Sequence, residues 1–217
     1  MELSHLGVRI DAIIGEIFMK DIVLGKRKHS GHLSAPKKVS LSFLAVIIFG
    51  AIVLSLPFAN KHHAASFLDN LFISTSAVCV TGLSPLTVVD QYNLFGQIVL
   101  IILVQIGGLG FLTFLYLFLF LARQRITLSK KLVFTEALNQ NSLSMLPRLL
   151  KTIFIYTVSI ETIGAIFLSM FFMPRLGALK GLYYGIWHSI SAFCNAGFDL
   201  CGSTSFVAYN TSPIINF

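Results

Sequence analysis

The stretches STSAVCVTGL (residues 74–83) and SISAFCNAGF (189–198) are two versions of one sequence, and their likeness decides the fold of this chain. Aligned at an offset of 115 residues, they share two serines, an alanine, a cysteine and a glycine. The matched pairs are Ser74 and Ser189, Ser76 and Ser191, Ala77 and Ala192, Cys79 and Cys194, and Gly82 and Gly197. Each version lies at the end of a short apolar segment that follows a long one. The chain therefore contains an internal repeat.

The segments around the first version differ in length. Residues 39–58 carry no charge, and twenty helical residues rising about 1.5 Å each cross a hydrocarbon core about 30 Å thick. Residues 64–78 are too short to cross and predict a re-entrant half-helix, whereas 94–122 are again long and uncharged. The order is span, half-helix, span, and residues 37–122 form one predicted repeat.

The same order begins again in the second half of the chain. A polar stretch, 123–149, predicts a cytoplasmic linker, and 150–173 predict another span that ends before Pro174. A short segment, 181–193, then leads into the second version of the repeated sequence. Residues 150–217 thus predict a second repeat that lacks its second span, and we expect the chain to be truncated.

Composition and charge support a membrane location. The chain has 217 residues, 55% hydrophobic and 12% charged, with a mean hydropathy of +0.82, whereas soluble domains carry roughly 25% charged residues. Thirteen of the sixteen lysines and arginines fall within residues 1–38 and 123–151. This clustering follows the positive-inside rule and predicts a multi-pass protein of the cell membrane with a cytoplasmic N-terminal arm, 1–36. The net charge of +7 is explained by topology, so no nucleic-acid partner is expected.

A half-helix that ends in a glycine turn within a membrane can bind a cation. Irregular backbone at membrane depth is tolerated where it lines a water-filled cavity or is buried in protein. The C-terminal end of a helix carries about half a negative charge, which favours a cation, and carbonyl oxygens beyond it can replace the hydration shell of the ion. Glycine supplies the backbone conformation that other residues avoid. Gly82 and Gly197 fit this role.

Three stretches together resemble a known family. SAVCVTGL (76–83), LFGQIVLIILVQIGGLGFLTF (94–114) and HSISAFCNAGFDL (188–200) are similar to the first two pore segments of the Ktr/Trk/HKT potassium transporter superfamily. The chain resembles the bacterial KtrB-type pore subunit most, over residues 36–217. The resemblance implies an all-α integral membrane protein of repeated span–re-entrant pore loop–span units, potassium-channel-like, with four units around one pathway. It also implies a cytosolic nucleotide-binding regulatory subunit of the KtrA type.

The resemblance also implies which residues bind the ion. The backbone carbonyls of one filter segment belong to Val80, Thr81, Gly82 and Leu83, and those of the other belong to Asn195, Ala196, Gly197 and Phe198. Glycine at the position of Gly82 goes with potassium preference in this superfamily. Potassium is then the transported ion, with no other cofactor expected and sodium dependence left open.

These expectations favour potassium uptake by the translocating subunit of a Ktr/Trk-type system. With two of four units in hand, the remaining half of the pore or a second copy in a homodimer is the expected partner, besides the lipid bilayer. The alternative is a non-transporting fragment or an assembly partner of a full-length pore subunit. No paired carboxylates, nucleophile–base pair or phosphate loop has a workable spacing, so an enzyme is not expected.

Several polar residues remain open at this stage. Asp69, Asp90 and Asp199 either attract cations or serve the local structure. Glu161 lies within a predicted span, where it is either protonated or paired with a residue of the missing half. The histidines and cysteines follow no recognised ligand spacing, so a metal site besides potassium is not expected. They are His62, His63, His188, Cys194 and Cys201, of which His188 and Cys194 are interpreted as packing residues.

Overall fold

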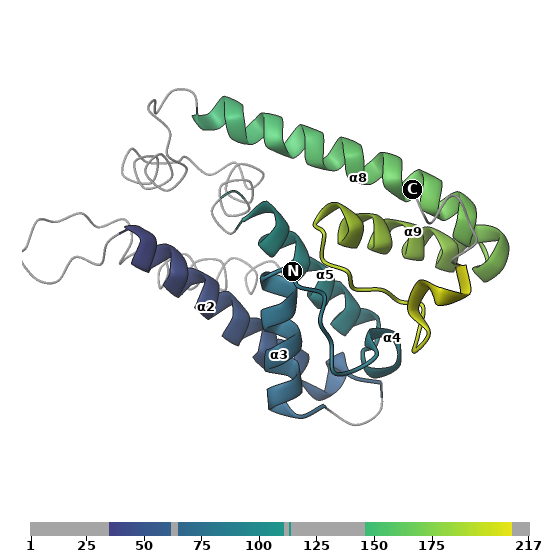
Figure 1. Ribbon diagram of the computed structural model, residues 1–217, viewed down its shortest axis with the longest axis horizontal. Helices are drawn as coiled ribbons and strands as arrows, with labels where there is room; N and C mark the ends of the chain where they lie inside the picture. The colour runs from purple at the N-terminus through teal and green to yellow at the C-terminus, as the bar shows by residue number, and fades with distance from the viewer. Residues whose placement is uncertain (1–34, 62–64, 111–112, 114–145, 210–217) are drawn as a thin grey trace, which may run out of the picture.

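The computed structural model describes residues 35–61, 65–110, 113 and 146–209, and Figure 1 shows the chain in these ranges as an assembly of helices. The helices are α2 (Ala35–Leu54), α3 (Phe67–Val78), α4 (Val88–Gln91), α5 (Leu94–Leu109), α8 (Leu146–Leu176) and α9 (Ala178–Phe193), with short 3-10 turns at Pro57–Ala59 and Ser205–Tyr209. The described ranges hold no strand beyond an isolated bridge between Asn60 and Tyr92. An all-helical chain is therefore confirmed for these ranges. The expectations for 1–34, 62–64, 114–145 and 210–217 lie outside the described residues.

The first half of the described chain is built from α2, α3 and α5, whose ends follow from local chemistry. Helix α3 begins where the Ser66 hydroxyl accepts a hydrogen bond from the amide of Leu68 at 3.1 Å. Helix α5 begins in the same way, with the Asn93 side chain accepting from the amide of Gly96 at 3.1 Å. It ends at Gly110, whose φ of +76° suits glycine. These caps place α3, which corresponds to the predicted half-helix, between two longer apolar helices.

The second half consists of α8 and α9, which pack along each other (Figure 1). The sequence predicted an end before Pro174, but α8 continues through Pro174 to Leu176. The amide of Gly177 then donates to the carbonyl oxygen of Met173 at 3.0 Å, and a φ of +85° at Gly177 turns the chain into α9. Helix α8 also starts at Leu146, inside the stretch predicted as a linker.

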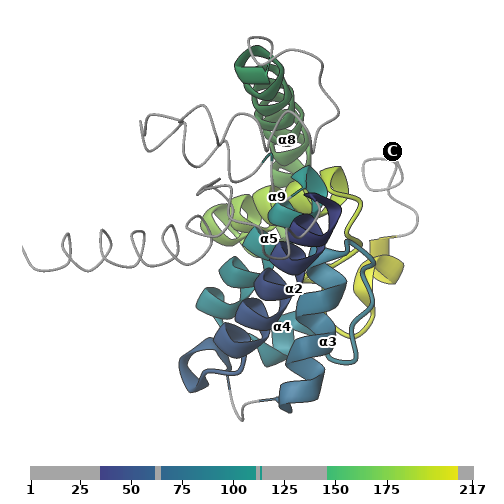
Figure 2. The same ribbon diagram turned by 90° about the vertical axis from the view of Figure 1, so that its left-hand side faces the viewer.

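Helix α5 joins the two halves. It contacts α2 and α3 on one side and α9 on the other, and Figure 2 shows it between α2 and α9. Two side chains of α9 bond to Gln97 of α5: the Tyr183 hydroxyl donates to its Oε1 at 2.9 Å, and the Trp187 indole donates to its backbone oxygen at 3.2 Å. Trp187 is among the largest fully buried side chains. The halves are therefore joined through a packed and hydrogen-bonded contact.

Apolar side chains are exposed along the outer helices. By length and composition, one helix of the described part of the chain could cross a membrane, over Arg148–Leu176 of α8, and the apolar parts of α2 and α5 are shorter. Phe49 and Ile52 of α2 and Ile163, Phe167 and Met170 of α8 are exposed. Apolar surface of this extent is typical of helices that face lipid or further protein.

A buried hydrogen bond joins the first turn of α3 to Tyr92, the residue after α4. The Tyr92 hydroxyl donates to the Asn70 side-chain oxygen at 2.6 Å, and both residues are fully buried. Burial, with a contribution from the Asp69 carboxylate, raises the pKa of Tyr92 well above its usual range. The phenol therefore keeps its proton at neutral pH and remains a donor to Asn70.

Candidate ion-binding site

The two repeated stretches end their helices with the same hydrogen bonds. At the end of α3, the amide of Thr81 donates to Ser76 O at 2.9 Å and that of Val80 donates to Ala77 O at 3.2 Å. At the end of α9, the amide of Ala196 donates to Ser191 O at 2.8 Å and that of Asn195 donates to Ala192 O at 2.9 Å. Both pairs are the 6→1 and 5→2 bonds of a Schellman motif. The repeat seen in the sequence is therefore a repeat of backbone geometry.

Left-handed backbone conformations recur at alternate positions in both turns. The φ angles are +51° at Val80 and +71° at Gly82 in the first, and +55° at Asn195 and +74° at Gly197 in the second. Asparagine tolerates this region, whereas a β-branched valine rarely adopts it. The strain at Val80 is offset by the Schellman bonds that fix its amide. Each glycine occupies the position for which its lack of a side chain is needed.

The two glycines face each other. A methyl group added at Gly82 would lie 2.3 Å from the backbone oxygen of Ala196 and 3.2 Å from the Cα of Gly197. A methyl group added at Gly197 would lie 3.6 Å from the Cα of Gly82. Residues 115 positions apart in the sequence thus meet through their backbones. The negative ends of α3 and α9 converge on this contact, because each helix ends just before its turn.

Side chains fix the segments that follow each turn. The hydroxyls of Ser76 and Thr81 lie 2.9 Å apart. The equivalent serine in the second half, Ser191, donates to the backbone oxygen of Phe198 at 2.7 Å. The two serines matched in the sequence therefore hold the residues that follow their own helices through different partners.

Two adjacent glycines of α5 contact different helices: one packs against the end of α3 and the other against the end of α9. A methyl group at Gly107 would lie 2.3 Å from the backbone oxygen of Val78, at the end of α3. One at Gly108 would lie 2.5 Å from the sulfur of Cys194, at the end of α9. Both glycines therefore allow close packing of α5 against its neighbours. Helix α5 thus packs between the C-terminal ends of α3 and α9.

A second repeated contact was missed in the sequence. The Ser74 hydroxyl donates to Ile47 O of α2, and the Ser189 hydroxyl donates to Glu161 O of α8, each at 2.7 Å. A glycine three residues after each acceptor makes room for the serine: methyl groups at Gly50 and Gly164 would each lie 2.5 Å from the hydroxyl oxygen. These glycines are 114 residues apart, one fewer than the serines, so alignment at a single offset misses the pair.

Glu161 has a polar partner in the first half. Its carboxylate accepts a hydrogen bond from the Gln105 amide of α5 at 2.8 Å, and the Gln105 oxygen lies 3.4 Å from the sulfur of Cys194. The sequence left Glu161 either protonated or paired with a residue of the missing half, whereas the partner found in the structure, Gln105, lies within the chain. The chain of contacts connects α8, α5 and the end of α9.

The three aspartates differ in their surroundings. Asp69 lies in the first turn of α3, where the positive helix end favours a carboxylate. Asp90 is exposed in α4. Asp199 accepts from the amide of Cys201 at 2.7 Å and from the hydroxyl of Ser205 at 2.6 Å, so it shapes the chain after the second turn.

The eight predicted site residues lie in the two touching turns, with different exposure. Thr81 and Leu83 are exposed in the first turn, whereas Ala196 and Phe198 are buried in the second. The structure brings the turns together through Gly82 and Gly197. That their carbonyl oxygens bind an ion stays a prediction.

Comparisons with known proteins agree with the resemblance. The family described as TrkH, cation transport protein, matches residues 13–217. The chain is 40% identical over 180 residues to the potassium/sodium uptake protein NtpJ of Enterococcus hirae, a match that covers 82% of this chain and 40% of that protein. It is 38% identical to the Ktr system potassium uptake protein B of Bacillus subtilis, over 83% of this chain and 40% of the relative.

The protein of the same name from Vibrio alginolyticus is also 38% identical, over 84% of this chain and 40% of its own length. The chain thus spans about 40% of the length of the curated relatives it matches. The predicted resemblance is confirmed: since the family match extends over nearly all of the sequence, this chain belongs to the TrkH family of cation transport proteins.

Proposed function

We propose that this chain supplies two units of the ion pathway in the translocating subunit of a Ktr/Trk-type system, which takes up potassium across the cell membrane. The relatives named above are potassium or potassium/sodium uptake proteins, which supports transport and not catalysis. Because the chain spans about 40% of their length, the activity of the whole protein is part of the proposal.

The observation that carries the proposal is the pair of touching glycine turns. Each turn follows the negative end of a helix, and each has left-handed residues at two alternate positions. Such alternation directs successive carbonyl oxygens toward one side of the chain, as the replacement of a hydration shell requires. The proposed ligands are the backbone oxygens of Val80 to Leu83 (80–83) and Asn195 to Phe198 (195–198).

The proposed arrangement in the membrane follows from the charges and the helices. Helices α3 and α9 act as re-entrant half-helices of the repeats 37–122 and 150–217, with α2, α5 and α8 as parts of spans. The lysine- and arginine-rich arm, 1–36, lies in the cytoplasm under the positive-inside rule. The protein is multi-pass.

Partners belong to the same proposal. Two relatives carry the name of a Ktr system, which supports an assembly of several components. We expect a KtrA-like cytosolic nucleotide-binding subunit to contact the cytoplasmic face. We also expect a homodimer, or a further stretch of pore, to complete the ring of carbonyl oxygens around the ion.

Gly82→Ser in a complete pore that carries this sequence tests the proposal. Uptake of rubidium and of sodium is measured in cells that lack other potassium uptake. The added side chain disturbs the contact with residue 196, so the variant should admit sodium while rubidium uptake falls. Gly177→Ser is the matched control, since Gly177 also has positive φ but has no atom within 4 Å of an added methyl group. Unchanged ion preference in Gly82→Ser, or an equal change in both variants, would refute the filter assignment.

A further inference from the structure

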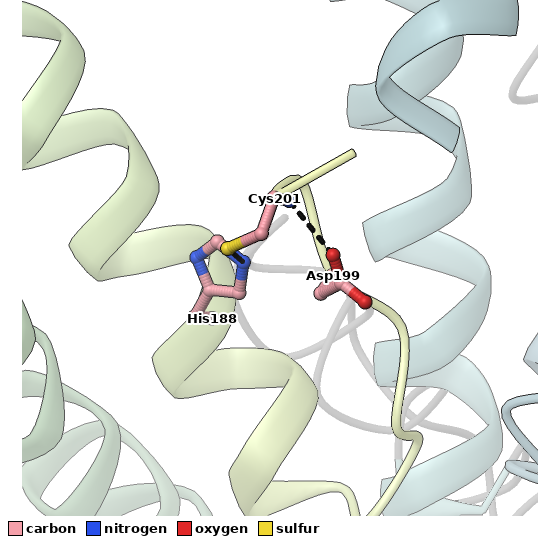
Figure 3. Close-up of side chains that lie close together, drawn as sticks. All are labelled: His188, Asp199 and Cys201. Carbon is pink, nitrogen blue, oxygen red and sulfur yellow. Dashed lines mark hydrogen bonds between the residues drawn. The ribbon is translucent and has the colours of Figure 1, made fainter. Parts of the chain in front are cut away.

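Three side chains that were not grouped in the sequence lie together after the second turn. His188 of α9, Asp199 and Cys201 each offer a ligand atom, and these atoms all lie within 4.8 Å of one another. Figure 3 shows the Cys201 sulfur joined by a dashed line to a ring nitrogen of His188, and the Asp199 carboxylate joined by another to the amide of Cys201. We propose that these three residues form a binding site for a divalent transition metal of the zinc and cadmium class.

The hydrogen bonds of His188 orient its ring for coordination. Its Nδ1 lies 2.7 Å from the backbone oxygen of Tyr184, which can only accept, so Nδ1 carries the proton. Nε2 therefore keeps its lone pair and faces the other two residues. A ring nitrogen that donates to a backbone carbonyl while the lone pair of the other nitrogen coordinates the ion is the usual arrangement of a histidine ligand. In the metal-free chain, this lone pair accepts from the amide of Leu200 at 3.0 Å.

Aromatic rings hold this orientation. The Phe172 ring stacks on His188 with centroids 5.3 Å apart, and the rings of Trp187 and Phe206 contact it at 5.5 Å and 5.1 Å. His188 itself is buried. A ring enclosed on several sides cannot rotate freely, so little order is lost when an ion binds.

The distances fit a tetrahedral ion. Zinc bound about 2.3 Å from sulfur and about 2.1 Å from nitrogen holds these two atoms roughly 3.6 Å apart. The Cys201 sulfur lies 3.9 Å from Nε2 of His188. To bring one oxygen of Asp199 closer, the carboxylate has to give up one of its bonds, to the amide of Cys201 or to the hydroxyl of Ser205. Imidazole, thiolate and carboxylate together suit zinc, cadmium or cobalt, with water as a fourth ligand.

Metal binding also replaces interactions of His188 and Cys201 that are present without the metal. The Cys201 thiol releases its proton to solvent when the sulfur coordinates the ion. The amide of Leu200, which donates to Nε2 at 3.0 Å, gives up that acceptor. Loss of this bond would free the backbone at Leu200, two residues after Phe198. An ion can enter from the surface, since Asp199 and Cys201 are half-buried and the neighbouring Ser203 and Thr204 are exposed.

The first half of the chain provides an internal comparison. The residues equivalent to His188, Asp199 and Cys201 at the 115-residue offset are Ile73, Ser84 and Leu86. The local turn is the same in both halves. The amide of Leu86 lies 3.4 Å from the Ser84 hydroxyl, and the amide of Cys201 donates to the Asp199 carboxylate in the equivalent way. None of these three side chains is a metal ligand of the same class. The site belongs to the second half alone.

Cobalt binding to the purified chain tests the site, with no polyhistidine tag and with Cys79→Ser to remove the exposed thiol. We expect one Co²⁺ per chain, with the visible bands of a tetrahedral ion and a near-ultraviolet thiolate-to-cobalt band that Zn²⁺ or Cd²⁺ abolishes by competition. Cys201→Ser should remove the thiolate band, and Asp199→Asn should weaken binding by about tenfold or more. Asp90→Asn, an exposed aspartate in α4, is the matched control and should change nothing.

Two results would overturn the proposal. One is the absence of a thiolate band in the Cys79→Ser chain; the other is a band that persists in Cys201→Ser. Circular dichroism checks that each variant keeps its helices, and Asp199→Asn decides the matter if Cys201→Ser does not fold. Inhibition of rubidium uptake by external Cd²⁺, relieved by Cys201→Ser, would extend the site to transport. That last step rests on the proposed function, and cobalt spectra without inhibition would leave the metal site standing while removing its link to transport.

Discussion

The first glycine turn and the second have the same backbone but different surroundings. Both end a half-helix with a Schellman motif and repeat left-handed conformations at equivalent positions. Cys194, at the start of the second turn, is buried against Gly108 and Gln105 of α5. Its equivalent Cys79 is exposed within the described part of the chain. The backbone conformation of each turn is therefore fixed by hydrogen bonds to the helix before it. The burial of the second turn, in contrast, depends on α5, a helix of the first half.

Thiol labelling is expected to reveal the largest difference between the two turns. In chains with a single cysteine, Cys79 should react rapidly with a small neutral maleimide, and Cys194 should react only when α5 separates from α9. An opening that costs about 3 kcal/mol slows the reaction about a hundredfold. Rates are followed by mass spectrometry, with a fully denatured sample as the reference. Equal rates in the folded chain would contradict the difference in burial.

Alanine at each glycine separates backbone conformation from contact. Gly82→Ala and Gly197→Ala share the strain of a positive φ, but only the methyl group at Gly82 lies 2.3 Å from a backbone oxygen. We expect Gly82→Ala to destabilise the chain by about 1–3 kcal/mol more than Gly197→Ala, the usual cost of overpacking. Thermal unfolding in detergent, followed by circular dichroism, measures the difference. A larger loss in Gly197→Ala would show that the turns do not meet as described.

The two glycines of α5 provide a rescue experiment. Gly108→Ala should destabilise by about 1–2 kcal/mol, since overlap with Cys194 exceeds the gain in helix propensity. Cys194→Gly, combined with Gly108→Ala, should recover most of the loss because it removes both the sulfur and the Cβ in the way. Gly107→Ala should show no such rescue, because its obstacle is the backbone oxygen of Val78. The test is a double-mutant cycle, and additive effects of the Gly108 and Cys194 substitutions would exclude the contact.

The smallest effects should be equal in the two halves. Ser74→Ala and Ser189→Ala each remove one hydrogen bond of 2.7 Å to a backbone oxygen of the preceding long helix. Each should cost about 0.5–1.5 kcal/mol, and the two losses should agree within error. Unfolding of the single and double variants provides the values. A clear inequality would mean that the repeated contact differs in strength between α2–α3 and α8–α9.

Much of this architecture could be predicted from the sequence because the decisive signals are local. Uncharged stretches of fixed length predict spans, and the shared serine, cysteine and glycine positions predict equivalent turns. The two turns were expected to line one pathway, but the direct contact of Gly82 with Gly197 was not predicted. The continuation of α8 through Pro174 was not predicted, because a proline in the last turn removes a single intrahelical bond and Gly177 supplies the true end.

What escaped prediction depends on contacts between segments distant in sequence. The bond from Gln105 to Glu161 joins α5 to α8, and neither residue signals the other. His188, Asp199 and Cys201 follow no recognised metal spacing, because α9 and the turn fold the chain back between the first and the other two. Gly50 and Gly164 could have been found by allowing a one-residue gap between the long helix and the half-helix.

The one-residue difference in spacing between the two halves has a practical consequence. Ser74 follows Gly50 by 24 positions and Ser189 follows Gly164 by 25, yet both pairs meet in the same way. The hairpin that joins each long helix to its half-helix thus accommodates an insertion without shifting the glycine turn. Epitope tags or fluorophores placed in these hairpins are suitable reporters of topology. Searches for duplicated units elsewhere should let this hairpin vary in length while matching the glycine and serine on either side.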